Sequence, residues 1–300
     1  MDSAAWSDVW SKTIHAEWPT LPRGPIVATG GGLSGWAARA WVDQLSSRGL
    51  AARFVPLSAF ATAPTDWSHR GAARVVFSCG LSPNARIALR APGHRGLWVL
   101  TSVSADTLWR FAPEAHRVPL PELPGDTPWA VSAVLASALA RLTGAHGPAP
   151  DWAPRTGVRT PTVIVHGPGL GSVAQWLAWG VMEHTGQAAP HVVDAMDLAH
   201  GTLKALAGRS ADVWVLPTPG GGTVWAQVRA SLATAGARVT DFGVHGARFG
   251  SNTGALRGGW LRAVATAARL PVGAPRRTID DGPLYRLEHP AGRALVGPVA

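Results

Sequence analysis

Short runs of apolar, mostly β-branched or bulky residues alternate with segments of helical periodicity in the first half of the chain. The runs cover residues 25–29, 53–57, 74–78 and 96–101, and the helical segments lie near residues 34–48 and 83–91. Because the runs are apolar on both faces of an extended chain, they are typical of strands in a parallel sheet that helices cover on both sides. The first half is therefore predicted to be an α/β sandwich.

The N-terminal segment, residues 2–17, carries apolar residues at the spacing of one helix face, namely Trp6, Val9, Trp10 and Ile14. This spacing predicts a helix that packs on the core rather than a frayed tail. The chain has 15 Trp. They stand singly at helical or strand spacing, which favours core packing as their role.

The order of strands in the first half recurs in the second. Residues 25–34 are echoed by residues 161–170, with an offset of 137 residues from Gly32 to Gly169. Three more pairs follow at nearly the same offset: residues 53–57 with 190–194, 75–77 with 213–215, and 97–101 with 237–241. The repeat predicts an α/β fold of two tandem three-layer α/β/α sandwiches with parallel sheets.

The Pro- and Gly-rich stretch at residues 144–154 has no periodicity, as expected of a connector between two domains. We therefore expect an added helix over residues 1–20, a first domain over 21–148 and a second domain over 149–300.

The composition narrows the class of protein. At 300 residues and 46% hydrophobic, the chain can bury one large core or two ordinary ones, which excludes disorder as a description of the whole. No stretch reaches the ~18 consecutive apolar residues of a membrane span, and residues 1–20 lack the apolar run of a signal peptide. A cytoplasmic protein without a membrane partner is expected.

The single cysteine, Cys79, can form neither an internal disulfide nor a thiolate zinc cluster, and no metal or cofactor is expected.

The net charge of +9 comes from 27 basic residues against 18 acidic ones. The Arg residues are scattered, whereas a nucleic-acid footprint needs a patch, so no nucleic-acid partner is expected. A basic field of this kind would draw a small anionic substrate.

Two predicted loops carry candidate binding groups. Residues 30–34, Gly-Gly-Gly-Leu-Ser, follow the first strand, and residues 77–84, which contain Ser78 and Ser82, follow the third. Ligands bind beyond the carboxyl ends of parallel strands, where glycines, hydroxyls and helix N-termini can together hold an anion. The alternative for each loop is a tight strand-to-helix turn with Ser as the helix cap.

These loops resemble motifs of the sugar isomerase (SIS) domain. Residues 30–34 look like its G-x-G-x-S turn, and residues 77–84 like its S-x-S-G-x-S-P-D phosphate loop. Residues 97–110 are similar to the strand and short helix that follow, residues 178–183 to its A-L-K-L-K-E helix, and residues 197–202 to its E-x-x-H-G-P turn. Over about residues 20–245 the order is that of proteins with two tandem SIS domains, such as the isomerase half of glucosamine-6-phosphate synthase and the ketosamine-6-phosphate deaminases and deglycases.

The resemblance implies substrate-binding roles for residues of both loops. They are Gly32, Ser34, Ser78, Cys79 and Ser82. Cys79 and Phe77 stand where the family carries Ser. A phosphate dianion in this fold is held mainly by charge-assisted bonds from hydroxyls and N–H groups, so the loss of two hydroxyls leaves open whether the substrate is phosphorylated.

The resemblance also implies a catalytic pair. Glu183 falls on the Glu that moves a proton between C1 and C2 of the open-chain sugar, and His200 falls on the His that assists ring opening. Glu183 ends a largely apolar helix, residues 173–182, where partial desolvation would raise its pKa toward a useful range. From the residues alone, an exposed helix-terminal Glu and a solvated loop His are the favoured interpretations. Lys204 is the only nearby candidate for a Schiff base, or else a solvated side chain.

The expected activity is that of an aldose-ketose isomerase of a sugar or sugar phosphate, or of a related ketosamine deaminase or deglycase. The alternative is a regulatory protein that binds a sugar phosphate without turning it over. The resemblance further implies a homodimer with its site near the subunit or domain interface.

Overall fold

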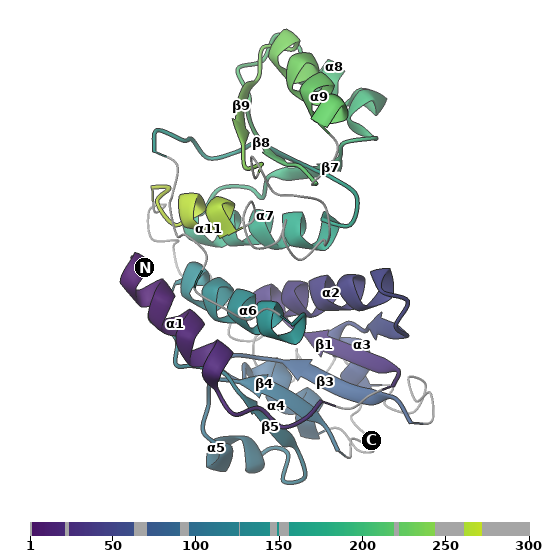
Figure 1. Cartoon of the computed structure of the whole chain (residues 1–300), viewed down its shortest axis with the longest axis vertical. Helices are drawn as coiled ribbons and strands as arrows, with labels where there is room; N and C mark the ends of the chain where they lie inside the picture. The colour runs from purple at the N-terminus through teal and green to yellow at the C-terminus, as the bar shows by residue number, and fades with distance from the viewer. Residues whose placement is uncertain are drawn as a thin grey trace, which may run out of the picture.

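The structure, a computed structural model, describes all residues except 1, 22–23, 63–70, 91–95, 126, 145–148, 150–155, 219–221, 244–260 and 272–300. The molecule has two parallel β-sheets, with one layer of helices between them and further helices on the outer face of each sheet (Figure 1).

The first sheet has the strand order β2-β1-β3-β4-β5, with every pair parallel. Its strands are β1 (Ile26–Gly30), β2 (Ala52–Phe54), β3 (Ala73–Phe77), β4 (Trp98–Thr101) and β5 (His116–Pro119). Successive residues of β3 enter different cores: Val75 and Phe77 pack toward the second sheet, and Val76 packs on the opposite face. The runs at residues 25–29, 74–78 and 96–101 are confirmed as buried strands. The run at 53–57 is wrong in part: β2 ends at Phe54, lies at the edge of the sheet and leaves Arg53 exposed, and a helix begins at Leu57.

Helices cover both faces of this sheet (Figure 1). On the face toward the second sheet lie α1 (Ser3–His15), α2 (Gly32–Ser47) and α6 (Pro128–Leu142). On the other face lie α3 (Leu57–Thr62), α4 (Pro83–Arg90) and α5 (Ala105–Trp109). The N-terminal helix is confirmed: Asp2 caps it by accepting a bond from the Ala5 N–H at 2.9 Å, and Trp6 and Trp10 are buried.

The second sheet repeats this topology. Its strands are β6 (Val163–His166), β7 (His191–Asp194), β8 (Asp212–Leu216) and β9 (Arg238–Asp241), in the order β7-β6-β8-β9. This order matches that of the first four strands, which confirms the strand repeat inferred from the sequence. Helices α7 (Gly171–Thr185) and α11 (Leu261–Ala267) lie on the face toward the first sheet, and the helical turn η1 (Leu198–Thr202), α8 (Leu203–Leu206) and α9 (Gly222–Thr234) lie on the outer face (Figure 1).

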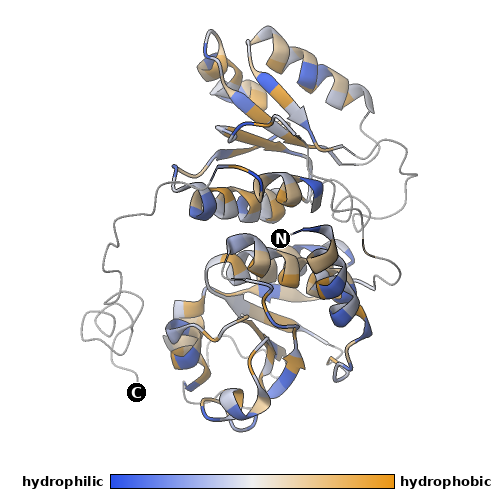
Figure 2. Cartoon of the chain, turned by 90° about the vertical axis from the view of Figure 1, so that its left-hand side faces the viewer, coloured by the Kyte–Doolittle hydropathy of each residue, from blue (hydrophilic) through white to orange (hydrophobic). Residues whose placement is uncertain are grey.

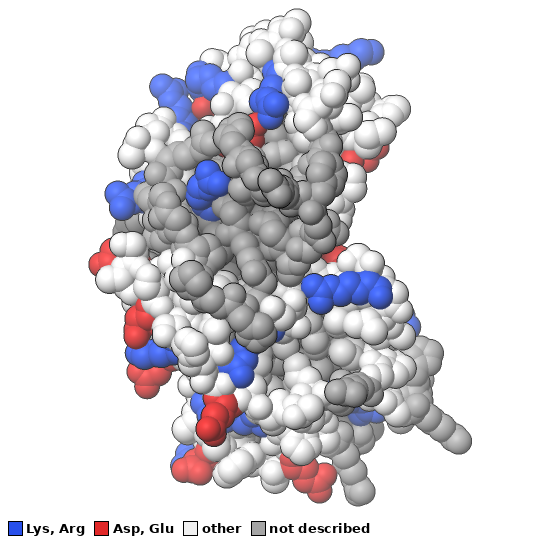
Figure 3. All heavy atoms as spheres, viewed as in Figure 1, with Lys and Arg blue, Asp and Glu red and all other residues white. Residues whose placement is uncertain are grey.

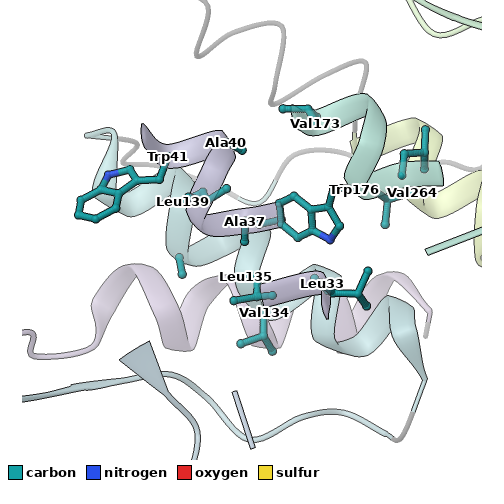
Figure 4. Close-up of a cluster of buried hydrophobic side chains, with 14 of the residues drawn as sticks. Leu33, Ala37, Ala40, Trp41, Val134, Leu135, Leu139, Val173, Trp176 and Val264 are labelled. Atoms are coloured by element: carbon teal, nitrogen blue, oxygen red, sulfur yellow. The ribbon is translucent and has the colours of Figure 1, made fainter. Parts of the chain in front are cut away.

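One continuous core joins the two halves. Side chains from α2, α6, α7 and α11 meet between the sheets (Figure 4). Figure 2 shows hydrophobic residues on the helices that lie between the two sheets. The buried Trp176 indole of α7 donates to the Ser132 hydroxyl of α6 at 3.2 Å. At Gly180 of α7, an added Cβ would lie 2.6 Å from the Trp129 ring of α6. Close packing of this kind fixes α7 against the helices of the first sheet.

The predicted connector at residues 144–154 falls mostly outside the described residues. Helix α6 ends at Leu142 and β6 begins at Val163. We retain the division into residues 1–20, 21–148 and 149–300 as a proposal.

Candidate functional site

The two candidate loops start side by side. Gly30, the last residue of β1, is the parallel neighbour of Phe77, the last residue of β3. The chain then enters α2 from β1 and α4 from β3, so the N-termini of both helices lie at the same edge of the sheet. The positive ends of two helix dipoles therefore converge where a ligand of an α/β sheet is expected.

The turn at residues 30–34, here called the glycine turn, needs glycine because its backbone passes close to the first turn of α2. A Cβ on Gly30 would lie 2.8 Å from the carbonyl carbon of Ser34, and Gly32 has a φ of +52°, a conformation that glycine adopts without strain. The residue at the helix cap, Gly31, has no side chain with which to bond the first N–H groups of α2. These N–H groups thus have no side-chain cap at the candidate site.

Ser34 and Cys79 tie the two loops together. Ser34 is buried, and its hydroxyl bonds the buried Cys79 thiol. Burial raises the pKa of the Cys79 thiol to about 12, against the smaller lowering effect of the Ser34 bond. The thiol is therefore a neutral, packed group, and the Ser34 hydroxyl is engaged within the protein.

We expect Cys79 to resist thiol reagents in the folded protein. A pKa of about 12 leaves roughly one thiolate in ten thousand at pH 8, and the thiolate is the reactive form. Treatment with 5,5′-dithiobis(2-nitrobenzoate) should modify Cys79 only after denaturation. Stoichiometric modification of the native protein within minutes would contradict this picture of the loops.

The loop from Ser78 to Ser82 is held in a strained conformation. Among the described residues, Leu81 alone of the non-glycines has a positive φ, 48°, and its side chain is fully buried. The Arg86 Nε donates to the Leu81 carbonyl at 2.8 Å. Ser78 is buried, whereas Ser82 is partly exposed at the start of α4. A non-glycine in this conformation costs on the order of 1 kcal/mol and is found most often at ligand-binding positions.

Two side chains that the sequence analysis did not single out also border this loop. Within the described part of the chain, Ser102 Oγ and Asn84 Oδ1 are buried and have no hydrogen-bond partner. Ser102 lies just after β4, where its N–H bonds the Cys79 carbonyl at 2.9 Å, and Asn84 lies in the first turn of α4. Buried polar atoms without partners are costly and indicate a place for water or a ligand. Ser102 lies directly after a strand end and Asn84 in the first turn of the helix after β3, the two kinds of position at which ligands of parallel sheets bind.

Glu183 reaches this edge through the packing of α7 on α2. The Ser172 hydroxyl at the start of α7 donates to the Asp43 carboxylate near the end of α2 at 2.5 Å. Trp179, two turns later on α7, meets Trp36, two turns earlier on α2, with ring centroids 6.4 Å apart. The helices are therefore antiparallel, and one further turn brings Glu183 level with Gly32. The packing of α7 on α2, the α2–α7 seam, therefore places Glu183 of the second half beside the glycine turn of the first half.

The Glu183 side chain is exposed, so the partial desolvation expected from the sequence is not found. The reason is the direction of its side chain: Glu183 lies on the solvent-facing side of the last turn of α7, whereas Val181 and Thr185 on the same turn are buried.

His200 and Lys204 lie elsewhere in the chain. Leu198 of η1 and Leu206 of α8 pack on the outer face of the second sheet, whereas α7 packs on its inner face. Within one chain the structure therefore brings Gly32, Ser78 and Ser82 to the same edge as Glu183 but leaves His200 and Lys204 across the second sheet. Both side chains are exposed.

The described residues also bear on a metal site and on a membrane span. No group of three or more His, Cys, Asp or Glu side chains among them is placed to hold a metal ion. None of the described helices is both long and apolar enough to cross a membrane. On the face shown in Figure 3, Lys and Arg side chains are spread over both halves of the molecule.

No family model matches the chain, and no curated protein matches it in sequence. Solved structures do match its fold. The C-terminal domain of glucosamine-fructose-6-phosphate aminotransferase from Francisella tularensis has a TM-score of 0.58 at 13% identity, over 92% of this chain and 90% of that one. Glucosamine-6-phosphate deaminase from Thermotoga maritima has a TM-score of 0.63 at 14% identity, over 88% and 91%. Tagatose-6-phosphate ketose/aldose isomerase from Escherichia coli has a TM-score of 0.56 at 17% identity, over 88% and 85%. At these identities the likeness shows the fold alone, a parallel-sheet α/β fold with two sheets, which is the fold class expected from the sequence.

Proposed function

We propose that the chain is a SIS-type enzyme that moves a proton between C1 and C2 of an open-chain sugar or sugar phosphate, as an aldose-ketose isomerase or a ketosamine deaminase or deglycase. The observation that carries the proposal is the antiparallel α2–α7 seam, which brings Glu183 to the glycine turn beside β3. The motif order in the sequence and the fold of the neighbours named above support it.

In this proposal Glu183 is the general base. Its carboxylate takes the proton from one carbon, an enediolate forms, and the same carboxyl returns the proton to the adjacent carbon. The exposed carboxylate is accessible to a substrate that lies along the first turn of α2. The converging N-termini of α2 and α4, with Gly32, Ser78 and Ser82, bind the anionic or hydroxyl-rich end. Ser34 and Cys79 hold the two loops in place through their mutual bond.

The test is exchange of the C2 proton with solvent. The wild-type protein is incubated in D₂O with hexoses, hexosamines and their 6-phosphates, and deuterium at C2 is followed by NMR. The proposal expects exchange with at least one of these sugars. Absence of exchange with every sugar that measurably binds would reject the enzyme.

The second candidate function is a regulatory protein that binds a sugar phosphate without turning it over. Its specific support is the loss of free hydroxyls at the loop: Phe77 and Cys79 are buried, and the Ser34 hydroxyl is already bonded. Binding without exchange is the result that would favour it.

A homodimer is part of the proposal, because His200 can assist ring opening at this site only if a second chain brings it there. Exposed apolar side chains, among them Trp179 on α7 and Met196 just before η1, provide surface for such a contact. Light scattering should give about twice the 31.2 kDa chain mass at micromolar concentration. A monomer would remove His200 from the proposed site.

A further inference from the structure

A hollow of about 580 Å³ opens at the amino edge of the second sheet. Thr162 just before β6, His191 at the start of β7 and Ala211 just before β8 mark that edge. Leu206, which packs in the outer core, lines the hollow as well and places it on the face away from α7. Its volume lies within the range of about 300–1,000 Å³ typical of small-molecule sites. The hollow is distinct from the carboxyl edge of the first sheet.

The polar lining of the hollow is basic and rich in hydroxyls. It comprises His191, His200, Arg209, Thr162, Thr202 and Ser210, with no Asp or Glu among its described lining residues. Within the described part of the chain, no hydrogen bond or ion pair engages the side chains of the two histidines or of Arg209. Three groups able to carry positive charge thus border one hollow without an anion to match them.

A carboxylate beside the lining residue Ala211, that of Asp212, is already paired. Asp212 begins β8, and Arg238 binds it with two bonds of 2.9 and 2.7 Å. The same guanidinium donates to the Ser210 hydroxyl at 2.7 Å. Asp212 therefore does not cancel the positive character of Arg209 and the histidines.

The backbone presents His200 to the hollow by a special turn. The helical path of η1 breaks at His200, with a ψ of 43°, and at Gly201, with a φ of +116°. No atom lies within 4 Å of the position of a Cβ on Gly201. The conformation, rather than lack of space, therefore requires glycine here, and it turns the chain so that His200 borders the open volume.

We propose that this hollow is a second ligand site, which binds the phosphate group of a small phosphate ester of monosaccharide size. Arg209 and the two imidazoles bind the phosphate oxygens, and Thr162, Thr202 and Ser210 supply hydroxyls. Val163 and Leu206 form an apolar wall against the C–H groups of the ester. The inference uses no residue of the first-sheet loops and no proton transfer. It shares His200 with the homodimer of the proposed function, but it holds equally for a monomer.

The test measures ligand binding at the two histidines that line the hollow. Imidazole resonances of His191 and His200, assigned with His191→Gln and His200→Gln, are followed by NMR while glucose 6-phosphate is added. Both are expected to shift in a saturable way, inorganic phosphate is expected to shift them with lower affinity, and glucose is expected to leave them unchanged. Arg209→Ala should weaken glucose 6-phosphate binding at these resonances about tenfold or more, since it removes a charge-assisted bond.

Arg110→Ala is the matched control, because it removes the same charge from an exposed position at the end of α5, and it should bind like the wild type. Unshifted imidazoles at saturating glucose 6-phosphate, or equal affinity in Arg209→Ala, would overturn the proposal. An equal loss in Ser82→Ala would also overturn it, because the hollow would then not be a separate site. The shift of the His191 and His200 resonances is expected whether or not the wild-type protein exchanges the C2 proton of any sugar.

Discussion

Glu183→Gln is expected to lose C2 proton exchange by about 10²- to 10⁴-fold, the usual contribution of a general base. The amide keeps the shape of the carboxylate and one acceptor oxygen but cannot take the proton. The loss should therefore fall on the chemical step, with ligand affinity nearly unchanged. Deuterium incorporation and calorimetric titration on the same protein preparation separate the two quantities.

The matched control is Glu114→Gln, which makes the same change at an exposed carboxylate between α5 and β5. It should exchange at the wild-type rate. Wild-type exchange in Glu183→Gln would show that another group is the base, and the α2–α7 seam would lose its catalytic role.

Gly180→Ala is expected to destabilise the fold by roughly 1–3 kcal/mol, the usual cost of adding a methyl group to a well-packed core. The added Cβ would lie 2.6 Å from the Trp129 ring, which is itself buried with only 2% of its surface exposed. Either α7 or the indole must move, and both belong to the core between the sheets. Urea denaturation should show a lower midpoint with an unchanged slope.

Gly222→Ala is the control for this prediction. Gly222 begins α9, and a Cβ added there meets no atom within 4 Å. Its midpoint should stay near that of the wild type. An unchanged midpoint in Gly180→Ala would mean that the helices between the sheets are less tightly packed than the structure shows.

The sequence predicts most of the fold because the strands carry their own signal. Runs such as Val75–Phe77 are apolar on both faces, and the same order recurs after a fixed offset. Helix α6 was not predicted, although Thr127 caps it through a 3.2 Å bond and Pro128 occupies its first position. The pair Thr-Pro at residues 127–128 is a sequence signal for the start of this helix.

The arrangement of the candidate site was harder to predict. That Glu183 is level with Gly32 depends on the antiparallel packing of α7 on α2, which no local pattern contains. That His200 lies across the second sheet depends on which face Leu198 and Leu206 bury. Both side chains were therefore assigned to one site from the resemblance alone, whereas the structure separates them within the chain.

A crystal structure with arabinonate 5-phosphate, a mimic of the open-chain intermediate, tests the central claim most directly. The claim is that the loops of the first sheet and Glu183 form one site. The account predicts the ligand at the carboxyl edge of the first sheet, between Ser82 and Glu183, with the Glu183 carboxylate about 3 Å from the carboxylate end of the mimic. A ligand found only in the hollow beside His200, with the edge at Gly32 empty and Glu183 turned to solvent, would contradict it.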